Sequence, residues 1–347
     1  MRYNRLGKTG LFVSELCLGT MTFGQAGGRY AAASGVNQET VDSILRRAID
    51  AGINFIDTAN VYADGQAEEI VGKSLQTLGI ARKDVVLATK FEHATGTGPN
   101  DGGGSRVHIV EAVKASLKRL GTDHIDLYQM HGWDPATPVE ETVRALDDLV
   151  RQGLVRYVGV SNWAAWQVAT ALGVADALGA SPFQTYQGYY SLAGRDIERE
   201  VTPMIEAHEL GLLVFSPLAG GYLTGKYRDK TDGRRATIPF PPVDETKGIK
   251  VLEVMDGIAA SHETTLEAVA LAWLRQKPVV ASIITGVKSL EQLNANLAAV
   301  ALTLTDREIA ALNDVGTIAL EYPGWMLAQG SAARASLMAT GVMPEAY

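Results

Sequence analysis

Four residues whose side chains transfer or position protons stand at or just beyond the ends of apolar runs. Asp57 closes NFID, Lys90 closes VVLATK and His131 follows IDLYQM. Tyr62 lies five residues beyond Asp57, in DTANVYADG. Charged residues at such positions are an unusual choice for core packing alone. If the runs are parallel strands of one barrel, their carboxyl ends share a face and the four side chains converge there.

The chemistry that suits this group is protonation of an oxygen. Tyrosine titrates near ~10 in water, too high for efficient proton donation at neutral pH. A Lys90 ammonium close to Tyr62 favours the phenolate, and Asp57 would fix Lys90 and keep it charged in a partly buried position. His131 would hydrogen-bond a substrate oxygen or share the proton transfer. The set therefore fits a reaction in which a carbonyl oxygen becomes an alkoxide.

Each of the four residues also has a structural explanation of its own. Asp57 could cap the following helix, and Tyr62 could be a surface aromatic of a loop. Lys90 could be a solvated strand end, and His131 a hydrogen-bonded histidine of the core. A barrel enzyme that uses Lys90 as a Schiff-base nucleophile is a further alternative. The matching positions of all four favour one shared site over four separate explanations.

The elements that must position these residues alternate along the chain. Eight short apolar runs begin at Ser14, Asn54, Val85, Ile125, Arg156, Pro182, Leu212 and Ala281. Most are apolar continuously, as in parallel strands buried on both faces. Amphipathic stretches between them predict helices, and strand–helix alternation predicts a (β/α)8 TIM barrel. The main alternative is a doubly wound open sheet, but no GxGxxG follows the first run.

Turn and cap residues predict where several elements end. Ser105 and Gly121 bound one helix, Pro138 and Gly153 bound the next, and Gly52 follows the first. The segment MRYNRLGKTGLFV predicts an N-terminal β-hairpin that caps the barrel. Long segments after the first, third and seventh runs predict loops on the catalytic face. No linker or repeat divides the chain, so we expect residues 1–347 to form a single domain.

Composition limits the classes of function. The formal net charge of −8 and a pI near 5.3 argue against nucleic acid or a membrane as partner. The single cysteine, Cys17, excludes an intramolecular disulfide, and the six histidines show no metal-ligand spacing. The start of the sequence lacks the apolar stretch of a secretory signal. We expect a cytoplasmic protein without a metal, and the oligomeric state stays open.

The motifs around the four residues resemble those of the aldo-keto reductase family. GINFIDTANVYADGQAEEIVGKSL is similar to the family signature around its catalytic Asp and Tyr, and ATK and LYQMHGWD complete its tetrad. The resemblance extends from RLGKTGLFVSELCLGTMTFG to the region near Asn296. It implies a barrel oxidoreductase in which Tyr62 is the general acid and Lys90 and Asp57 lower its pKa. It also implies that His131 positions the carbonyl.

The resemblance further implies that NADPH lies extended across the strand ends. The matching positions for the nicotinamide and its ribose are Gly19, Thr20, Met21, Asp57, Ser161, Asn162, Gln187 and the stacking residue Phe215. Those for the pyrophosphate are Ser216, Pro217, Leu218, Gly220, Gly225 and Lys226. Those for the 2′-phosphate and adenine are Gly286, Lys288, Gln292 and Asn296. A cation beside a helix N-terminus is a ready anion site, but Lys288 lacks the fork of an arginine, so NADH use is also possible.

Large aromatic residues near the expected site are candidates for a substrate pocket. They are Phe23, Tyr30, Trp133 and Trp325. Such a pocket would accept a small-molecule aldehyde or a bulky ketone, which would be reduced reversibly to the alcohol. A second function to weigh is an NADPH-binding regulatory subunit with low turnover, because potassium-channel β-subunits share this family's fold.

Overall fold

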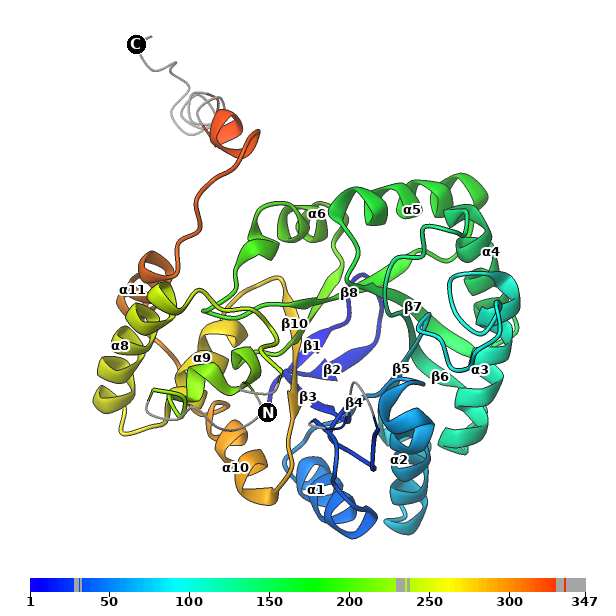
Figure 1. The fold of residues 1–347 in the computed structure, drawn as a ribbon, viewed down its shortest axis with the longest axis horizontal. Helices are drawn as coiled ribbons and strands as arrows, with labels where there is room; N and C mark the ends of the chain where they lie inside the picture. Colours follow the sequence, from blue (N-terminus) through cyan, green and yellow to red (C-terminus); the bar gives the residue numbers. More distant parts are fainter. Residues whose placement is uncertain (28–30, 32, 229–234, 236–237, 329–333, 335–347) are drawn as a thin grey trace.

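Eight parallel strands close into a barrel in the computed structural model of the chain, which describes residues 1–27, 31, 33–228, 235, 238–328 and 334. The strand order around the barrel is β10-β3-β4-β5-β6-β7-β8-β9 (Figure 1). The strands are β3 (Leu16–Gly19), β4 (Phe55–Asp57), β5 (Val86–Phe91), β6 (Ile125–Met130), β7 (Val155–Ser161), β8 (Phe183–Tyr189), β9 (Gly211–Phe215) and β10 (Val280–Gly286). Each contains most of one predicted run, so the predicted (β/α)8 barrel is confirmed.

A ring of helices surrounds the strands (Figure 1). Those of the described residues are α1 (Gln38–Asp50), α2 (Gln66–Thr77), α3 (Arg106–Leu120), α4 (Val139–Arg151), α5 (Ala165–Leu178), α6 (Val201–His208), α8 (Glu245–Ser261), α9 (Leu266–Arg275), α10 (Leu290–Ala298) and α11 (Asp306–Val315). Short 3-10 turns include η2 (Tyr62–Gly65) and η5 (Ala219–Thr224). The predicted ends of α3 are confirmed: the Ser105 hydroxyl accepts the His108 amide, and Gly121 adopts a left-handed φ of 63°.

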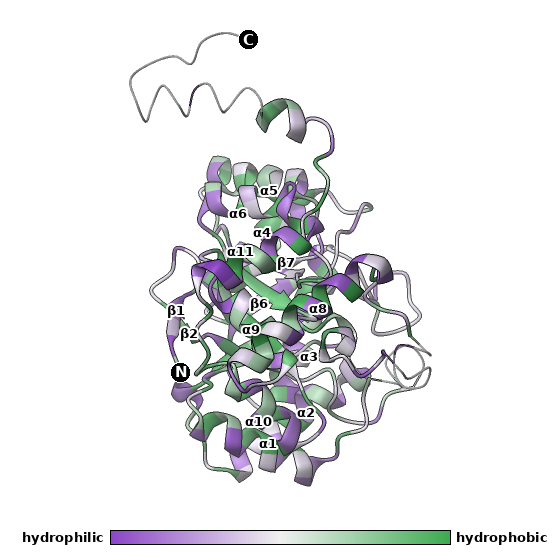
Figure 2. Cartoon of the chain, turned by 90° about the vertical axis from the view of Figure 1, so that its left-hand side faces the viewer, coloured by the Kyte–Doolittle hydropathy of each residue, from purple (hydrophilic) through white to green (hydrophobic). Residues whose placement is uncertain are grey.

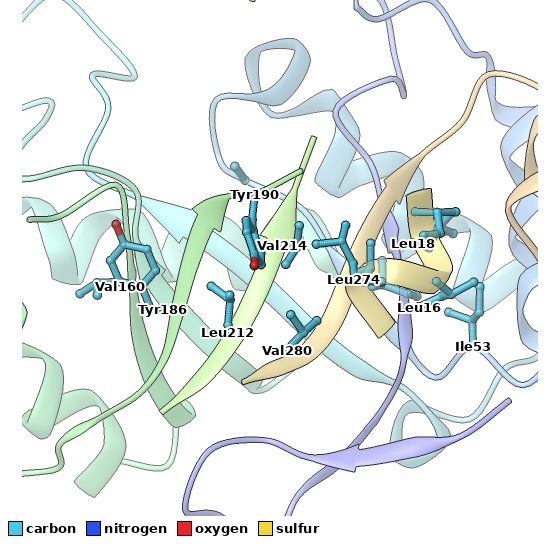
Figure 3. Close-up of a cluster of buried hydrophobic side chains, with 14 of the residues drawn as sticks. Leu16, Leu18, Ile53, Val160, Tyr186, Tyr190, Leu212, Val214, Leu274 and Val280 are labelled. Carbon is cyan, nitrogen blue, oxygen red and sulfur yellow. The ribbon is translucent and has the colours of Figure 1, made fainter. Parts of the chain in front are cut away.

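The strands are apolar on both faces because each face packs against a different layer. On β9, Leu212 and Val214 pack outward in the core between strands and helices, whereas Leu213 belongs to a cluster inside the barrel. Figure 3 shows the outer layer, where strand residues such as Val214 and Val280 meet Leu274 of α9. In Figure 2, where hydrophobic residues are green and hydrophilic residues purple, the purple residues lie mainly on the helices around the green strands. Burial on two sides explains the continuous apolar runs in the sequence.

An antiparallel hairpin closes the end of the barrel where the strands begin. Its strands β1 (Tyr3–Arg5) and β2 (Phe12–Ser14) confirm the predicted cap. The Asn4 side-chain amide donates to the Ala281 carbonyl, close to the start of β10, over 2.9 Å. Leu6 and Val13 are fully buried and pack in the interior cluster with residues from the surrounding strands. The hairpin thus fills the end of the barrel that lies opposite the carboxyl ends of the strands.

We expect Leu6→Ala to destabilise the protein, because it leaves a cavity in the floor of the barrel. Core Leu→Ala changes cost about 2–5 kcal/mol in unfolding free energy. Phe12→Ala on the same hairpin is the matched control, since Phe12 is 56% exposed, and should change stability far less. Midpoints of urea unfolding measure both variants. Equal shifts in the two midpoints would contradict the role given to the hairpin.

Candidate active site

The structure brings Asp57, Tyr62, Lys90 and His131 together at the carboxyl end of the barrel. Asp57 is the last residue of β4, and Lys90 lies one residue before the end of the neighbouring strand β5. His131 directly follows β6, and Tyr62 begins the turn η2 that comes after β4. Three adjacent strands therefore deliver the group, as their positions at strand ends predict.

Lys90 is the centre of this group. Its side chain is fully buried, and its Nζ donates to Asp57 Oδ2 over 2.5 Å, to the Thr58 carbonyl over 2.8 Å and to the Tyr62 hydroxyl over 3.3 Å. Burial is the largest single effect and lowers the pKa of Lys90, but the charges and hydrogen bonds of Asp57 and Tyr62 together outweigh it. The net result is a pKa raised above the ordinary 10.5. Lys90 is therefore an ammonium at neutral pH.

Asp57 is held by two amides on its other oxygen. Gln187 Nε2 donates to Asp57 Oδ1 over 2.9 Å, and Gln129 Nε2 donates to the same atom over 3.2 Å. Both glutamines are buried, and sequence reasoning missed Gln129. The available signal was an amide inside the apolar run IDLYQM, which needs a partner when the strand is buried. Gln187, which we expect to contact the nicotinamide, therefore also holds Asp57 in place.

Tyr62 and His131 face each other across the site. Their rings meet edge to face with centroids 6.0 Å apart. Tyr62 is 8% exposed, so its ring is largely covered. The Asn162 side-chain amide donates to the His131 carbonyl over 3.0 Å and to the Ser161 hydroxyl over 3.0 Å. A phenol, an imidazole and a buried ammonium therefore border one space, which suits proton transfer to an oxygen.

A second histidine stands beside the site and was missed from the sequence. The His93 ring lies 4.4 Å from the His131 ring, centroid to centroid, and its Nδ1 lies 2.8 Å from Glu92 Oε2. Glu92 has a φ of 107°, which is strained for a residue with a side chain. Glu92 and His93 directly follow β5 in the sequence. They open a long glycine-rich loop, whose path cannot be predicted, so the sequence did not indicate that His93 lies beside His131. The structure places a carboxylate–imidazole pair next to His131.

The residues expected at the nicotinamide lie at or near the carboxyl ends of β3, β4, β7, β8 and β9. Gly19 pairs with Gly286 of β10, and a Cβ on Gly19 would lie 2.7 Å from Ile284 Cγ2. Thr20 is fully buried, and its hydroxyl has no hydrogen-bond partner among the described residues. Met21 is partly buried against the core. Phe215 ends β9, with its ring 6.1 Å from that of Tyr189.

The segment expected to hold the pyrophosphate has an unusual backbone. Ser216, Ala219, Gly220 and Gly225 all have positive φ values, between 49° and 74°. Pro217 and Leu218 lie within this segment, and the Lys226 Nζ stands 5.1 Å from the centre of the Tyr227 ring. Several amides of the segment, including those of Ala219 and Gly225, donate to carbonyls within it. Turns with positive φ can expose other amides to an anion, as in known phosphate sites.

The residues expected at the 2′-phosphate gather at the N-terminus of α10. Ser289 is its N-cap and accepts the Gln292 amide. The Gln292 side chain accepts the Lys288 amide over 2.7 Å, and Lys288 Nζ donates to the Ser34 carbonyl over 2.9 Å. Gly286 immediately precedes this turn at the end of β10. Asn296, farther along the same helix, is 6% exposed.

The residues expected in the substrate pocket have different surroundings. Phe23 is fully buried in the core, where the strand–loop connection bridges to Val36, so it lines no open pocket. Trp325 lies on the segment that follows α11, where it is 45% exposed and its ring centroid lies 6.0 Å from that of Tyr322. Figure 1 shows this segment extending away from the barrel. Tyr30 lies outside the described residues. Trp133 remains, two residues after His131, with its ring 4.6 Å from that of Trp163.

Two other kinds of feature are missing from the described residues. They contain no cluster of three or more side chains that could hold a metal ion. Their helices include none with the length and apolar character needed to cross a membrane.

Comparisons with known proteins agree with the geometry. The profile of the Aldo/keto reductase family matches residues 15–317. A probable voltage-gated potassium channel subunit beta of Arabidopsis thaliana is 40% identical over 309 residues, which cover 86% of this chain and 91% of the relative. The uncharacterized oxidoreductase YrpG of Bacillus subtilis is 38% identical over 91% of this chain and 96% of its own. Norsolorinic acid reductase of Aspergillus flavus is 35% identical over 92% of this chain and 83% of its own.

We expect Asp57→Asn to destabilise the protein strongly, because it leaves the Lys90 ammonium buried beside a neutral amide. Removing one partner of a buried ion pair costs about 3–5 kcal/mol, whereas replacing both is milder. The double variant Asp57→Asn/Lys90→Met should therefore unfold at a higher urea concentration than Asp57→Asn alone. Asp123→Asn is the control, since the Asp123 side chain is 92% exposed. The coupling would be contradicted if the double variant lost as much unfolding free energy as Asp57→Asn and Lys90→Met lose in sum.

Proposed function

Because this chain belongs to the aldo/keto reductase family, we propose that it is an NADPH-dependent reductase that converts an aldehyde or ketone to the alcohol, reversibly. The observation that supports this proposal best is the 3.3 Å hydrogen bond from Lys90 Nζ to the Tyr62 hydroxyl. A phenol beside a permanent ammonium can give up its proton at neutral pH far more readily than a phenol in water. Proton donation by Tyr62 is the step that carbonyl reduction requires.

Each residue of the group has one task in this proposal. Tyr62 donates its proton to the carbonyl oxygen, and the Lys90 ammonium stabilises the phenolate that remains. Asp57 keeps Lys90 charged and in place through the 2.5 Å ion pair. His131 holds the carbonyl oxygen within reach of Tyr62. In the reverse direction Tyr62 is the base that takes the alcohol proton.

The charge state of Lys90 argues against Schiff-base chemistry. A nucleophilic lysine needs a neutral amine, which burial or a nearby cation provides by lowering its pKa. Lys90 has the opposite arrangement, because Asp57 raises its pKa. Its three donor positions are also directed to Asp57, Thr58 and Tyr62. The arrangement is therefore that of a cation that tunes a neighbour.

The residues around the group fit NADPH. The buried Thr20 hydroxyl has a free hydrogen-bonding capacity at the position expected for the nicotinamide ribose. Ser161, Asn162 and Gln187 supply the hydroxyl and amides that a carboxamide requires. Residues 216–226 would hold the pyrophosphate, and Lys288 at the start of α10 would hold the 2′-phosphate. NADPH supplies the hydride when bound, with NADH as a weaker substitute.

The substrate side of the proposal rests on aromatic residues beside His131. The Trp133 ring lies 4.6 Å from Trp163 and 6.0 Å from Trp166, and Trp166 is 64% exposed. Flat apolar surfaces of this kind bind aromatic or bulky carbonyl compounds. One relative, 35% identical, is named norsolorinic acid reductase, which is consistent with reduction of an organic substrate by this chain. A screen of NADPH oxidation across aldehydes, quinones, steroidal and terpenoid ketones and sugars tests the proposal.

The similarity to a potassium channel subunit beta supports one other candidate, an NADPH-binding regulatory subunit. Such a protein would bind NADPH tightly and turn over slowly. The same screen separates the two functions when it is run beside a fluorescence titration of NADPH. Tight binding with negligible oxidation across all the carbonyl compounds, together with capture of a membrane protein, would favour the regulatory function.

We expect Tyr62→Phe to lower kcat for carbonyl reduction by about 10²- to 10⁴-fold, the usual contribution of a positioned general acid. Binding of NADPH should stay within about twofold, since the ring remains. Tyr3→Phe removes a hydroxyl at the far end of the barrel, where it donates to the Gly52 carbonyl, and should keep full activity. Steady-state kinetics and fluorescence titration measure both variants. Retained turnover in Tyr62→Phe refutes the assignment of the acid.

We expect Lys288→Ala to raise the KM for NADPH by roughly tenfold or more, because a charge-assisted contact to phosphate is worth about 1.5–3 kcal/mol. The KM for NADH should change little, because NADH lacks the 2′-phosphate. Lys114→Ala on α3 is a charge-matched control, since Lys114 is exposed and pairs only with Glu111. An equal rise for both nucleotides speaks against the 2′-phosphate site.

A further inference from the structure

The turn that carries Tyr62 is strained. The three residues after it all have left-handed backbones, with φ values of 49° at Ala63, 55° at Asp64 and 92° at Gly65. Ala63 and Asp64 have side chains that disfavour this region, and Ala63 is fully buried. Such a conformation persists only where the surrounding structure holds it. The position of Tyr62 therefore depends on whatever fixes this turn.

Arg119 of α3 lies directly against the turn. A Cβ on Gly65 would lie 2.9 Å from Arg119 Cδ and 3.0 Å from Arg119 Nε. Gly65 therefore serves two purposes, the left-handed φ and the close approach of the arginine. The same Nε donates to Glu68 Oε2 over 2.7 Å, so the arginine is itself held in place.

Glu68 joins three elements at this point. It lies in the first turn of α2, directly after the strained turn, and its side chain is fully buried. Oε2 accepts from Arg119 of α3, and Oε1 accepts from the Thr89 hydroxyl of β5 over 2.5 Å. Thr89 immediately precedes Lys90, and successive strand residues point to opposite faces. Glu68 thus ties the outer face of β5 to the turn, while Lys90 reaches Tyr62 on the inner face.

Glu68 is fully buried and Arg119 is 22% exposed, and an ion pair that takes a carboxylate out of water needs an explanation other than stability. Packed apolar residues in place of a buried pair are often equally stable or more so. What the pair does supply is a fixed geometry, since both oxygens of the carboxylate are directed to named partners. That geometry spans the two elements whose separation sets the distance between Lys90 Nζ and the Tyr62 hydroxyl.

We propose that Glu68, with Arg119 and Thr89, positions Tyr62 against Lys90 for proton transfer. The inference rests on the proposed function, because it assigns a positioning role within that same site. Loosening the tie would let Tyr62 move away from the ammonium. The phenolate would then be less stabilised, and Tyr62 would release its proton at higher pH.

The test is Glu68→Gln, which keeps the volume and one acceptor oxygen but removes the charge that holds Arg119. We expect kcat to fall about ten- to hundredfold, because a displacement near 1 Å costs up to about 10²-fold. The KM values for NADPH and the carbonyl compound should stay within about twofold. The loss of reduction rate at high pH should move to higher pH, and the rate of alcohol oxidation at neutral pH should fall.

Asp126→Asn is the matched control for loss of a structural tie. Asp126 Oδ2 accepts from Arg82 over 2.6 Å and from the Leu87 amide over 2.8 Å, so it also fixes β5, but near the start of the strand. This variant should lower the melting temperature and leave the pH profile unchanged. The same displacement of the profile in Asp126→Asn and Glu68→Gln overturns the proposal, as does an unchanged profile in Glu68→Gln.

Thr89→Val serves if Glu68→Gln fails to fold, because it removes a single hydroxyl from the same tie and should move the profile in the same direction. An unmoved profile in Thr89→Val then overturns the proposal. Direct titration of Tyr62 by NMR, with carbon-13 at the tyrosine Cζ and Tyr62→Phe to assign the signal, needs no turnover. A shift of that titration in Glu68→Gln supports positioning even if the wild type reduces none of the carbonyl compounds, which would contradict only the proposed function.

Discussion

A buried ammonium cannot exist in a protein without compensation, and the end of this barrel is arranged around that constraint. Lys90 is fully buried, and it receives one carboxylate, one carbonyl and one phenol as partners. The carboxylate must come from the adjacent strand, because its reach is short, and Asp57 ends that strand. Asp57 in turn needs donors for its second oxygen, which two glutamines from β6 and β8 provide. Tyr62 lies beside the Lys90 ammonium, while Asp57 and the Thr58 carbonyl provide most of the compensation for its charge.

The two ends of the barrel differ in backbone conformation: the end where the strands begin is regular, and the end where they finish is strained. The strand starts meet a hairpin and well-packed apolar side chains. Most of the non-glycine residues with positive φ follow the carboxyl ends of β4, β5, β7 and β9: Ala63, Asp64, Glu92, Asn162, Ser216 and Ala219. Backbone strain of this kind gathers where a site must be presented in one geometry. The regular end provides the rigidity that allows the other end to depart from ideal backbone.

How far the sequence predicts this structure depends on whether a feature is local. Strand runs, helix caps and the residues that end strands are local, so the barrel and the meeting of Asp57, Lys90 and His131 follow from them. The surroundings of Phe23 and Trp325 could not be predicted in this way, because an aromatic residue suits a core, a pocket or a surface equally, and only the path of the loop or tail decides. Gln129 and Glu68 escape notice because each occupies an ordinary position in a strand or helix. Their importance comes from partners that lie 72 and 51 residues away.

The hairpin across the barrel floor has a consequence for protons. Leu6 and Val13, with Phe55, Leu127 and Leu213, fill the interior beneath the site with hydrocarbon. No chain of polar groups among these residues leads from the floor to Lys90. In the proposed reduction, the proton that Tyr62 donates would be replaced from the loop side, where His131 and the Glu92–His93 pair lie. The same side would then admit both the substrate and the water that returns a proton to the phenol.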